Sequence, residues 1–452
     1  MKLETIIREA LVGLIVSFVA LSLGASLGIL SGRGAFVGML SAGIIAVITS
    51  ALGGTRVQCS GPTAPMSAVS ATVVAFAVGK LADQASHVIP DHFINTVFIL
   101  TGILLLIMAI LRLGRFILLV PNVVISGFMN GIAVLIWLSQ LKKIFGIGEI
   151  IPFSGGTWLN LIVVLATLAV IFIFPKISQK LFPKMAHFLS PTLISIVLVT
   201  ALVHLSGISI EFVSLRTEIH SLGDFLQFVN GQFPTDLSLT ILIIALPFAL
   251  QLAMLCYLDT LLTSLVVDKM TKEKTLQNKE LMAQGIANST VGLLGGIPGA
   301  QATIRSVLMI KEGATLRLAG ILTGGFVLIE MVLFQDFISL IPEAVFAGIL
   351  FKVGYDVFDW LPIRLYFKEL YKETSKLLHD FFSRHDDEPI YVTNREMLTI
   401  VGTTSVTVFW DLNIAVISFT LLFYLVNKVI SPNNPIRDLA VDIETTRLPK
   451  EN

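Results

Sequence analysis

Long runs of hydrophobic residues, separated by short polar segments, recur along almost the whole chain. Twelve of them approach the roughly 20 residues that a helix needs to cross the hydrocarbon core of a bilayer. These runs lie near 10–30, 35–52, 92–111, 118–139, 157–174, 189–206, 236–267, 281–296, 315–335, 340–358, 397–411 and 412–430. Two shorter apolar segments, 63–79 and 300–311, follow stretches rich in Gly and Pro. The pattern predicts an all-α polytopic membrane protein with fourteen transmembrane segments, two of them half-helices.

The two Gly/Pro stretches stand out because they cannot continue a helix. Gly295–Arg305 reads GGIPGAQATIR, and Gly53–Ser67 reads GGTRVQCSGPTAPMS. Aligning Pro62 with Pro298 also aligns Ser67 with Thr303, which indicates corresponding positions in two halves of the chain. A break in a membrane helix is tolerated where it lines a cavity or is buried in protein. Two such breaks, each followed by the N-terminus of a half-helix, are typical of a transporter's binding site.

The segments fall into two sets of seven around a polar linker. We therefore expect a first repeat, a linker outside the cell, a second inverted repeat with one long cytoplasmic excursion, and a short tail. Their predicted bounds are 1–206, 207–235, 236–431 with the excursion at 361–396, and 432–452. Lys and Arg concentrate in alternate loops, which by the positive-inside rule predicts cytoplasmic N- and C-termini in the cell's inner membrane.

Composition supports a lipid bilayer as the surroundings of the chain. Of its 452 residues, 55% are hydrophobic and 14% are charged, against roughly a quarter charged in soluble domains. The net charge is zero, which argues against a nucleic-acid partner. We interpret the two cysteines, Cys59 and Cys256, as reduced core residues, and small residues such as Gly24, Ser26 and Gly28 as sites of close helix packing. The chain shows no credible catalytic constellation, and we expect no enzyme.

Two charged residues within apolar segments suggest a binding site. Asp259 lies inside the run at 236–267, and Thr263 follows one turn later on the same helical face. A carboxylate at that depth needs a cation, a proton or a polar cavity, and these oxygen donors suit a small alkali cation such as Na⁺. Arg305 follows the second break, where a guanidinium would attract an anion. The alternatives are a structural hydrogen bond for Asp259, and pairing or snorkelling for Arg305. For Glu280 and Glu330 we expect helix packing.

Several longer motifs, in a fixed order, resemble the sulfate permease family of anion transporters. They are SGPTAPMSAV at 60–69, PNVVISGFMNGIAV at 121–134, LDTLLTSLVVDKMT at 258–271, KELMAQGIANSTVGLLGGIPGAQATIRS at 279–306 and AGILFKVGYDVFDW at 347–360. The resemblance implies seven plus seven inverted repeats divided into a core and a gate domain, often as a homodimer. It also implies a small inorganic anion such as sulfate, bicarbonate or chloride as substrate.

The second half is most similar to the sodium-dependent bicarbonate branch of that family. By this resemblance, Na⁺ is the coupling ion and not a prosthetic group. The positions that match its ligands are Asp259, Thr263, Gln301 through its backbone, and Thr303. The positions that match the anion site are Thr63, Ala302 and Thr303, chiefly through backbone N–H groups, and Arg305 joins them by the argument above.

The sequence departs from the family pattern in two places. No match to the family's cytoplasmic STAS domain follows the last hydrophobic run. Ser22 and Leu27 also replace a proline and an aromatic residue common in the first span. We expect secondary active transport with Na⁺ and bicarbonate in symport. The alternatives are sulfate transport coupled to Na⁺ or H⁺, anion exchange, an anion channel, and a nucleobase transporter of the same architecture.

Overall fold

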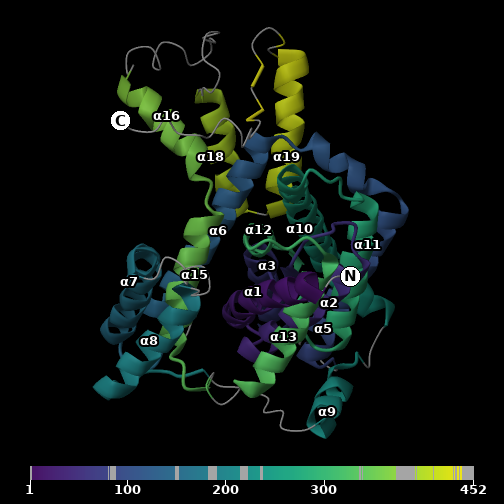
Figure 1. Cartoon of the computed structure of the whole chain (residues 1–452). Helices are drawn as coiled ribbons and strands as arrows, with labels where there is room; N and C mark the ends of the chain where they lie inside the picture. Colours follow the sequence, from purple (N-terminus) through teal and green to yellow (C-terminus); the bar gives the residue numbers. More distant parts are fainter. Residues whose placement is uncertain are drawn as a thin grey trace. The chain divides into compact units, whose positions relative to one another are not determined.

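The described part of the chain folds almost entirely into helices in the computed structural model (Figure 1). The structure describes residues 3–79, 81, 88–147, 152–181, 191–213, 222–234, 238–334, 337, 339–372, 392, 394–410, 412–430, 432, 435–436 and 438–439. Up to residue 232 the elements are α1 (Leu3–Leu30), α2 (Ala35–Leu52), β1 (Ser60–Gly61), α3 (Ala64–Gly79), α5 (Pro90–Ile110), η1 (Leu113–Leu119), α6 (Asn122–Phe145), α7 (Thr157–Leu181), α8 (Pro191–Ser206) and α9 (Leu222–Gln232).

The remaining elements repeat this pattern of long and short helices. They are α10 (Leu239–Thr271), α11 (Gln277–Leu293), β2 (Ala300–Gln301), α12 (Thr303–Lys311), α13 (Arg317–Leu333), α15 (Glu343–Val357), α16 (Trp360–Lys372), α18 (Asn394–Phe409), α19 (Leu412–Leu425) and η2 (Val426–Ile430). Each of the fourteen predicted apolar segments contains a helix. Within the described ranges, six helices are long and apolar enough to span a bilayer, namely α1, α2, α5, α6, most of α7 and most of α10.

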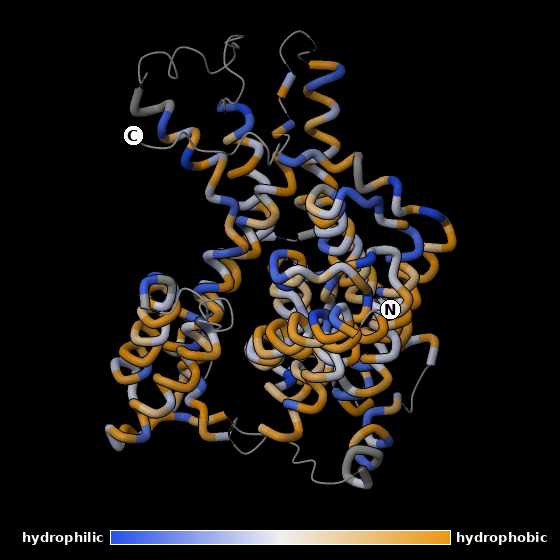
Figure 2. Tube along the Cα trace, viewed as in Figure 1, coloured by the Kyte–Doolittle hydropathy of each residue, from blue (hydrophilic) through white to orange (hydrophobic). Residues whose placement is uncertain are grey.

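One helix differs from what the sequence pattern predicted. The linker at 207–235 contains a further helix, α9, whose last residue accepts a hydrogen bond at its carbonyl from Asn95 Nδ2 at 2.7 Å. The excursion predicted at 361–396 begins within α16, where hydrophobic and hydrophilic residues alternate (Figure 2). Residues 373–391 of that excursion lie outside the described residues.

Contacts between helices divide the chain into two compact units. The first consists of residues 1–117 and 138–352, and the second of residues 118–137 and 353–452. In the first unit α2 and α1 pack against α13, while α5 packs against α11 and α10. Helices from the first half of the sequence therefore pack against helices from the second half, as intertwined repeats require. In the second unit α18 packs against α19 and close to α6, where Thr404 Oγ1 donates to Gly127 O.

Glycines allow α1 and α2 to approach each other at backbone distance. A Cβ added to Gly28 would lie 2.3 Å from Gly34 O, and one added to Gly38 would lie 2.0 Å from Gly24 O. Small residues serve this purpose in membrane helices because close contact there depends on van der Waals packing and not on the exclusion of water. The close packing expected from the sequence at Gly24 and Gly28 is confirmed.

We expect Gly38→Ala to destabilise the first unit. The added methyl group overlaps Gly24 O, and both helices must move apart, at a cost of about 1–3 kcal/mol for an overpacked core. Thermal unfolding of the purified protein in detergent measures this as a lower midpoint. Gly325→Ala on α13 is the matched control, since nothing lies within 4 Å of its added Cβ. Equal midpoints for the two variants would contradict the backbone contact between α1 and α2.

Candidate functional site

The two Gly/Pro stretches interrupt the helices and meet each other in a short strand pair. β1 and β2 run antiparallel, with Ser60 opposite Gln301 and Gly61 opposite Ala300. The pair is extended by a hydrogen bond from Ala302 N to Cys59 O at 3.1 Å. Because α3 follows β1 and α12 follows β2, both half-helices begin beside the same strand pair. The predicted interruptions are confirmed.

The alignment of Pro62 with Pro298 does not match the two breaks as they fold. Pro62 stands between its strand and its half-helix, whereas Pro298 precedes its strand. A comparison by structure pairs the strand starts, Ser60 with Ala300, and thereby places Thr63 opposite Thr303. Both threonines lie where a half-helix begins, since α3 starts directly after Thr63 and α12 starts at Thr303. The alignment on proline is therefore wrong, because the two prolines serve different parts of their breaks.

Glycines are required where the two breaks cross. Gly61 has a φ of +155°, and a Cβ on it would lie 2.8 Å from Nη1 of Arg305. A Cβ on Gly299 would lie 2.2 Å from Gly61 O. Side chains at these positions would push the strands apart, because both contacts involve backbone or a buried guanidinium. The Gly-rich sequence of each break thus follows from the close approach of the other.

Backbone donors collect at the two helix starts. The first helical hydrogen bond of α3 runs from Ser67 N to Thr63 O, and that of α12 from Ser306 N to Ala302 O. The N–H groups of Ala64 and Met66 in α3, and of Thr303, Ile304 and Arg305 in α12, therefore have no partner inside their own helix, while Pro65 has no N–H. The N–H of Ala302 is different, since it is bonded to Cys59 O. Ala302 thus occupies the predicted helix start, but its own N–H serves the strand pair.

Oxygen atoms converge beside these helix ends. Asp259 on α10 has a buried Oδ2 atom without a hydrogen-bond partner among the described residues, although the residue as a whole is partly exposed. The Thr63 hydroxyl lies beside this carboxyl and is itself buried without a well-formed hydrogen bond. One turn after Asp259, Thr263 Oγ1 lies 2.6 Å from Thr303 Oγ1. The structure therefore gathers one carboxylate and three hydroxyl groups from α10 and the two breaks.

Gln301 has buried side-chain polar atoms available in addition to the backbone group that the family resemblance implied. Its N–H donates to Thr260 Oγ1 at 3.2 Å, while both polar atoms of its fully buried side chain lack partners within the described structure. Buried polar atoms are nearly always hydrogen-bonded, so unsatisfied ones indicate a ligand or water. Carboxylate, hydroxyl and amide oxygens are hard donors, and they fit an alkali cation such as Na⁺.

Arg305 is fully buried, with 1% of its surface exposed. Its Nη2 donates to Pro62 O at 2.9 Å, while Nε and Nη1 have no hydrogen-bond partner among the described residues. Asp259 is close enough to act on this charge electrostatically. Within the part of the chain that the structure describes, however, no carboxylate lies within the 4.0 Å of an ion pair. Neither an ion pair nor snorkelling explains the position of Arg305. Its Nε and Nη1 atoms therefore remain available as hydrogen-bond donors at the helix ends.

Two polar side chains that the sequence analysis missed hold the second break in place. Asn288 on α11 accepts from Gly299 N at 2.7 Å and donates to Gly299 O at 3.0 Å, so it satisfies both backbone polar groups of Gly299. Ser41 on α2 accepts from Ile297 N at 2.8 Å. The sequence held a signal for Asn288, because an asparagine within a membrane helix needs a polar partner.

Glu280 and the two cysteines pack outside the site, as the sequence predicted, and Arg56 pairs at the surface. Arg56 forms an exposed ion pair with Glu273 at 2.7 Å. Glu280 accepts hydrogen bonds from Thr55 N, Gln58 Nε2 and Gln284 Nε2, and it thereby anchors the segment that precedes β1. Cys59 and Cys256 are free and buried.

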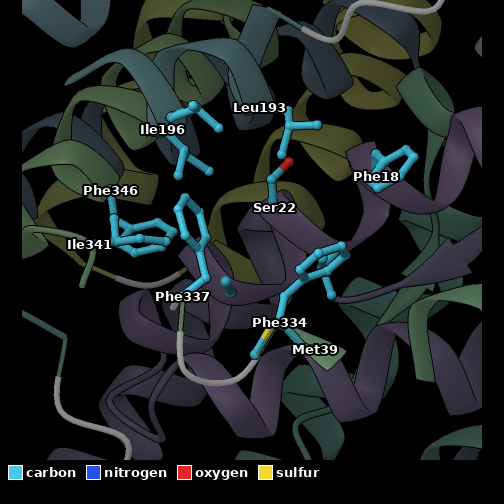
Figure 3. A pocket seen from close by; sticks show the side chains of 12 residues that line it. Phe18, Ser22, Met39, Leu193, Ile196, Phe334, Phe337, Ile341 and Phe346 are labelled. Atoms are coloured by element: carbon cyan, nitrogen blue, oxygen red, sulfur yellow. The ribbon is translucent and has the colours of Figure 1, made fainter. Parts of the chain in front are cut away.

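An apolar cavity of about 350 Å³ lies elsewhere in the first unit (Figure 3). Side chains of α1, α2, α8 and α15 line it, among them Ser22, and so do Phe334 and Phe337 between α13 and α15. The Ser22 hydroxyl already donates to Val19 O at 3.1 Å. Leu27 is buried and does not line the cavity, and neither does any residue of the predicted ion site. The cavity offers apolar surface only.

Several known proteins have sequences similar to that of this chain. The bicarbonate transporter BicA of a Picosynechococcus strain is 32% identical over 373 residues, which are 77% of this chain and 61% of that protein. The putative sulfate transporter YvdB of Bacillus subtilis is 27% identical over 94% of this chain and 74% of its own length. The chain therefore spans about three fifths of the length of the first of these relatives.

Solved structures and the family profile agree with these relatives. The transmembrane domain of a cyanobacterial bicarbonate transporter BicA matches with a TM-score of 0.72 at 26% identity, over 92% of this chain and 98% of that one. Murine Slc26a9 in the inward-facing state shares the fold, with a TM-score of 0.72 at 16% identity over 94% and 69% of the two chains. The profile described as "Sulfate permease family" matches residues 8–368. The chain is a multi-pass membrane protein and belongs to the sulfate permease family.

Proposed function

We propose that this protein is a secondary active transporter that moves bicarbonate together with Na⁺ across the cytoplasmic membrane. The observation that carries the proposal is the pair of opposite charges, Asp259 and Arg305, where the two half-helices begin. Each has buried polar atoms without partners among the described residues. The bicarbonate relative at 32% identity supports the choice of substrate.

The anion would bind between the half-helix ends. The unused N–H groups of both helices and the Nε and Nη1 atoms of Arg305 supply donors, and the positive ends of the helix dipoles favour negative charge. Thr63 and Thr303 lie at the two helix starts and would contribute hydroxyl groups. An oxyanion accepts several hydrogen bonds at once, which matches this set of donors.

Na⁺ would bind on the α10 side of the same region. The carboxylate of Asp259, the hydroxyls of Thr263 and Thr303, and oxygen atoms of Gln301 supply ligands of the type that the ion prefers. Thr303 is common to both proposed sites. It touches Thr263 at 2.6 Å and begins the half-helix that faces the anion.

Charge balance explains why the two ions would bind together. With both ions absent, the negative charge of Asp259 and the positive charge of Arg305 offset each other. Na⁺ alone leaves the site with a net positive charge, and bicarbonate alone leaves it net negative. When both bind, the site is again neutral, so each ion favours the other by a coupling free energy of about 1–3 kcal/mol. The same count favours a monovalent anion over sulfate, which would leave one excess negative charge beside a single Na⁺.

Transport would then follow from movement of the core domain that holds both half-helices against a gate domain. We further propose that the termini lie in the cytoplasm, because Lys and Arg concentrate in the loops on that side in the predicted topology. A homodimer is the proposed assembly.

Uptake by the reconstituted protein tests the proposal. We expect labelled bicarbonate to accumulate in proteoliposomes under an inward Na⁺ gradient, and to do so far less with an H⁺ gradient or with neither. Protein-free liposomes at mildly alkaline pH control for permeation of carbon dioxide. Accumulation of sulfate instead of bicarbonate would show that sulfate is the substrate. Passive anion flux that does not depend on any cation would indicate a channel. Absence of flux for bicarbonate, sulfate and chloride would overturn the proposal.

A further inference from the structure

A second buried carboxyl group lies on α13, outside the proposed ion site. Glu330 is 5% exposed, and its Oε1 atom lies 2.6 Å from Oγ of Ser17 on α1. Its Oε2 atom is buried and has no hydrogen-bond partner among the described residues. An ionised carboxylate so placed would have at most one donor for two oxygen atoms, which is a costly arrangement away from water.

Counting hydrogen atoms shows where a proton must lie. Ser17 Oγ is 2.8 Å from Leu14 O as well as 2.6 Å from Glu330 Oε1. A serine hydroxyl has one hydrogen and can donate it fully to one of these two acceptors. If Glu330 carries a proton at Oε1, it donates to Ser17 Oγ, and Ser17 donates to Leu14 O. Both short contacts are then proper hydrogen bonds, and no negative charge is buried.

The surrounding helices supply no cation that could balance an ionised Glu330. Arg317 on the same helix is thirteen residues away, about 20 Å along α13, and donates to Ser50 O. Neither α2 nor α3, which pack beside α13 and α1, has an ionisable side chain. The ionisable residues on the other elements that pack against α1 are Arg305 and Lys311 of α12 and His204 of α8, and those of α1 itself are Glu4, Arg8 and Glu9. Three of these side chains form hydrogen bonds elsewhere, namely Arg305 to Pro62 O, His204 to Leu340 O and Arg8 to Thr315 Oγ1. Within the described residues, none of them forms an ion pair with Glu330.

Glu9, in the same helix pair, is a buried carboxyl group whose two oxygen atoms both have hydrogen-bond donors. It is fully buried on α1, and its two oxygen atoms accept from Thr315 N at 2.8 Å, Thr315 Oγ1 at 2.9 Å and Leu316 N at 3.2 Å. These donors precede the first turn of α13, where a negative charge is stabilised by the helix dipole. Glu330 lies near the opposite end of α13, where the dipole disfavours a negative charge.

We propose that Glu330 is a proton-binding site between α1 and α13. The protonated carboxyl group donates a hydrogen bond to Ser17 Oγ. Loss of the proton would leave Ser17 with two competing acceptors and a buried charge with no balancing cation. The contact between α1 and α13 is therefore proton-dependent. Ser22 lies five residues beyond Ser17 on α1 and lines the apolar cavity, so a change in this contact would reach the cavity wall.

Infrared spectroscopy of the purified protein detects the proton directly. In a detergent without ester groups and with saturating Na⁺, we expect a carbonyl-stretch band of a protonated carboxylic acid at neutral pH. The band should shift to lower frequency in D₂O and vanish in Glu330→Gln, whose amide can still donate to Ser17. Glu9→Gln is the matched control and should leave the band unchanged. A wild-type spectrum without the band, or one in which Glu330→Gln retains it, would overturn the proposal.

A second variant covers the possibility that Glu330→Gln does not fold. Ser17→Ala keeps the carboxyl group and removes its hydrogen-bond acceptor. A protonated Glu330 then gives a band at higher frequency than in the wild type, because its carboxylic acid is no longer hydrogen-bonded. If Glu330 were ionised and Ser17 were its donor, Ser17→Ala would show no change in this region.

The consequence for uptake rests on the proposed function, whereas the spectroscopic result does not. We expect uptake by the wild type to fall at alkaline pH and uptake by Glu330→Gln to fall less, since the amide cannot lose its proton. A protein without any uptake but with the band would overturn the proposed function and leave the proton site standing. Identical pH profiles in wild type and variant, with the band present, would remove the link between the proton and transport.

Discussion

Asp259→Asn is expected to abolish the Na⁺ dependence of bicarbonate uptake while the protein remains folded. The amide removes the only carboxylate among the proposed Na⁺ ligands, and a neutral amide binds an alkali cation much more weakly. The charge balance of the site also changes. Arg305 then leaves a net positive charge in the empty site, so the anion no longer needs Na⁺ to neutralise the complex.

Two measurements separate this outcome from simple inactivation. Calorimetric titration should show no Na⁺ binding to Asp259→Asn, while the bicarbonate affinity measured without Na⁺ is at least as high as that of the wild type. Glu273→Gln is a suitable control because it neutralises an exposed carboxylate that pairs with Arg56 at the surface. Normal Na⁺ binding and normal Na⁺-driven uptake in Asp259→Asn would rule out Asp259 as the cation site.

Arg305→Met should have the opposite effect. Methionine is unbranched and fills much of the same space, but it removes the positive charge and the two donor atoms that lack partners. Hydrogen bonds to charged groups are worth about 1.5–3 kcal/mol each, so the loss of even one of them should raise the bicarbonate dissociation constant by about 10- to 150-fold. Na⁺ should still bind, and more tightly in the absence of the anion, because Asp259 is no longer offset.

The control for this variant is Arg56→Gln, which removes an exposed arginine that precedes the first break. It should leave both affinities unchanged. The midpoint of thermal unfolding of Arg305→Met must also be measured, since the variant loses the bond to Pro62 O. Parallel loss of Na⁺ and anion binding in a folded Arg305→Met protein would contradict separate roles for the two charges.

How well the sequence predicted a feature depends on whether neighbouring residues or residues distant along the chain determine that feature. Each hydrophobic run predicted a helix with ends that differ by up to seven residues, as at α1 and α7, and α2 has the predicted bounds 35–52. Both breaks were also predicted, because Gly and Pro act on the chain locally. The helix α9 was missed because its stretch, 222–232, is neither long nor strongly apolar. The sequence analysis paired the wrong residues of the two breaks because it aligned Pro62 with Pro298. Only the strand pair shows which residues correspond.

By itself, the sequence determined that this protein is a helical membrane protein with two interrupted helices, that Asp259 lies inside an apolar run and that Arg305 lies at the second interruption. Hydrophobic length, helix breakers and charges within apolar runs are local properties, readable from neighbouring residues. Only the tertiary structure decided that the two breaks pair as antiparallel strands and that Asn288 holds the peptide of Gly299. It also placed Ser17, from the first helix, against Glu330. Each of these contacts joins residues that are distant along the chain or on different helices, and depends on how the helices pack together.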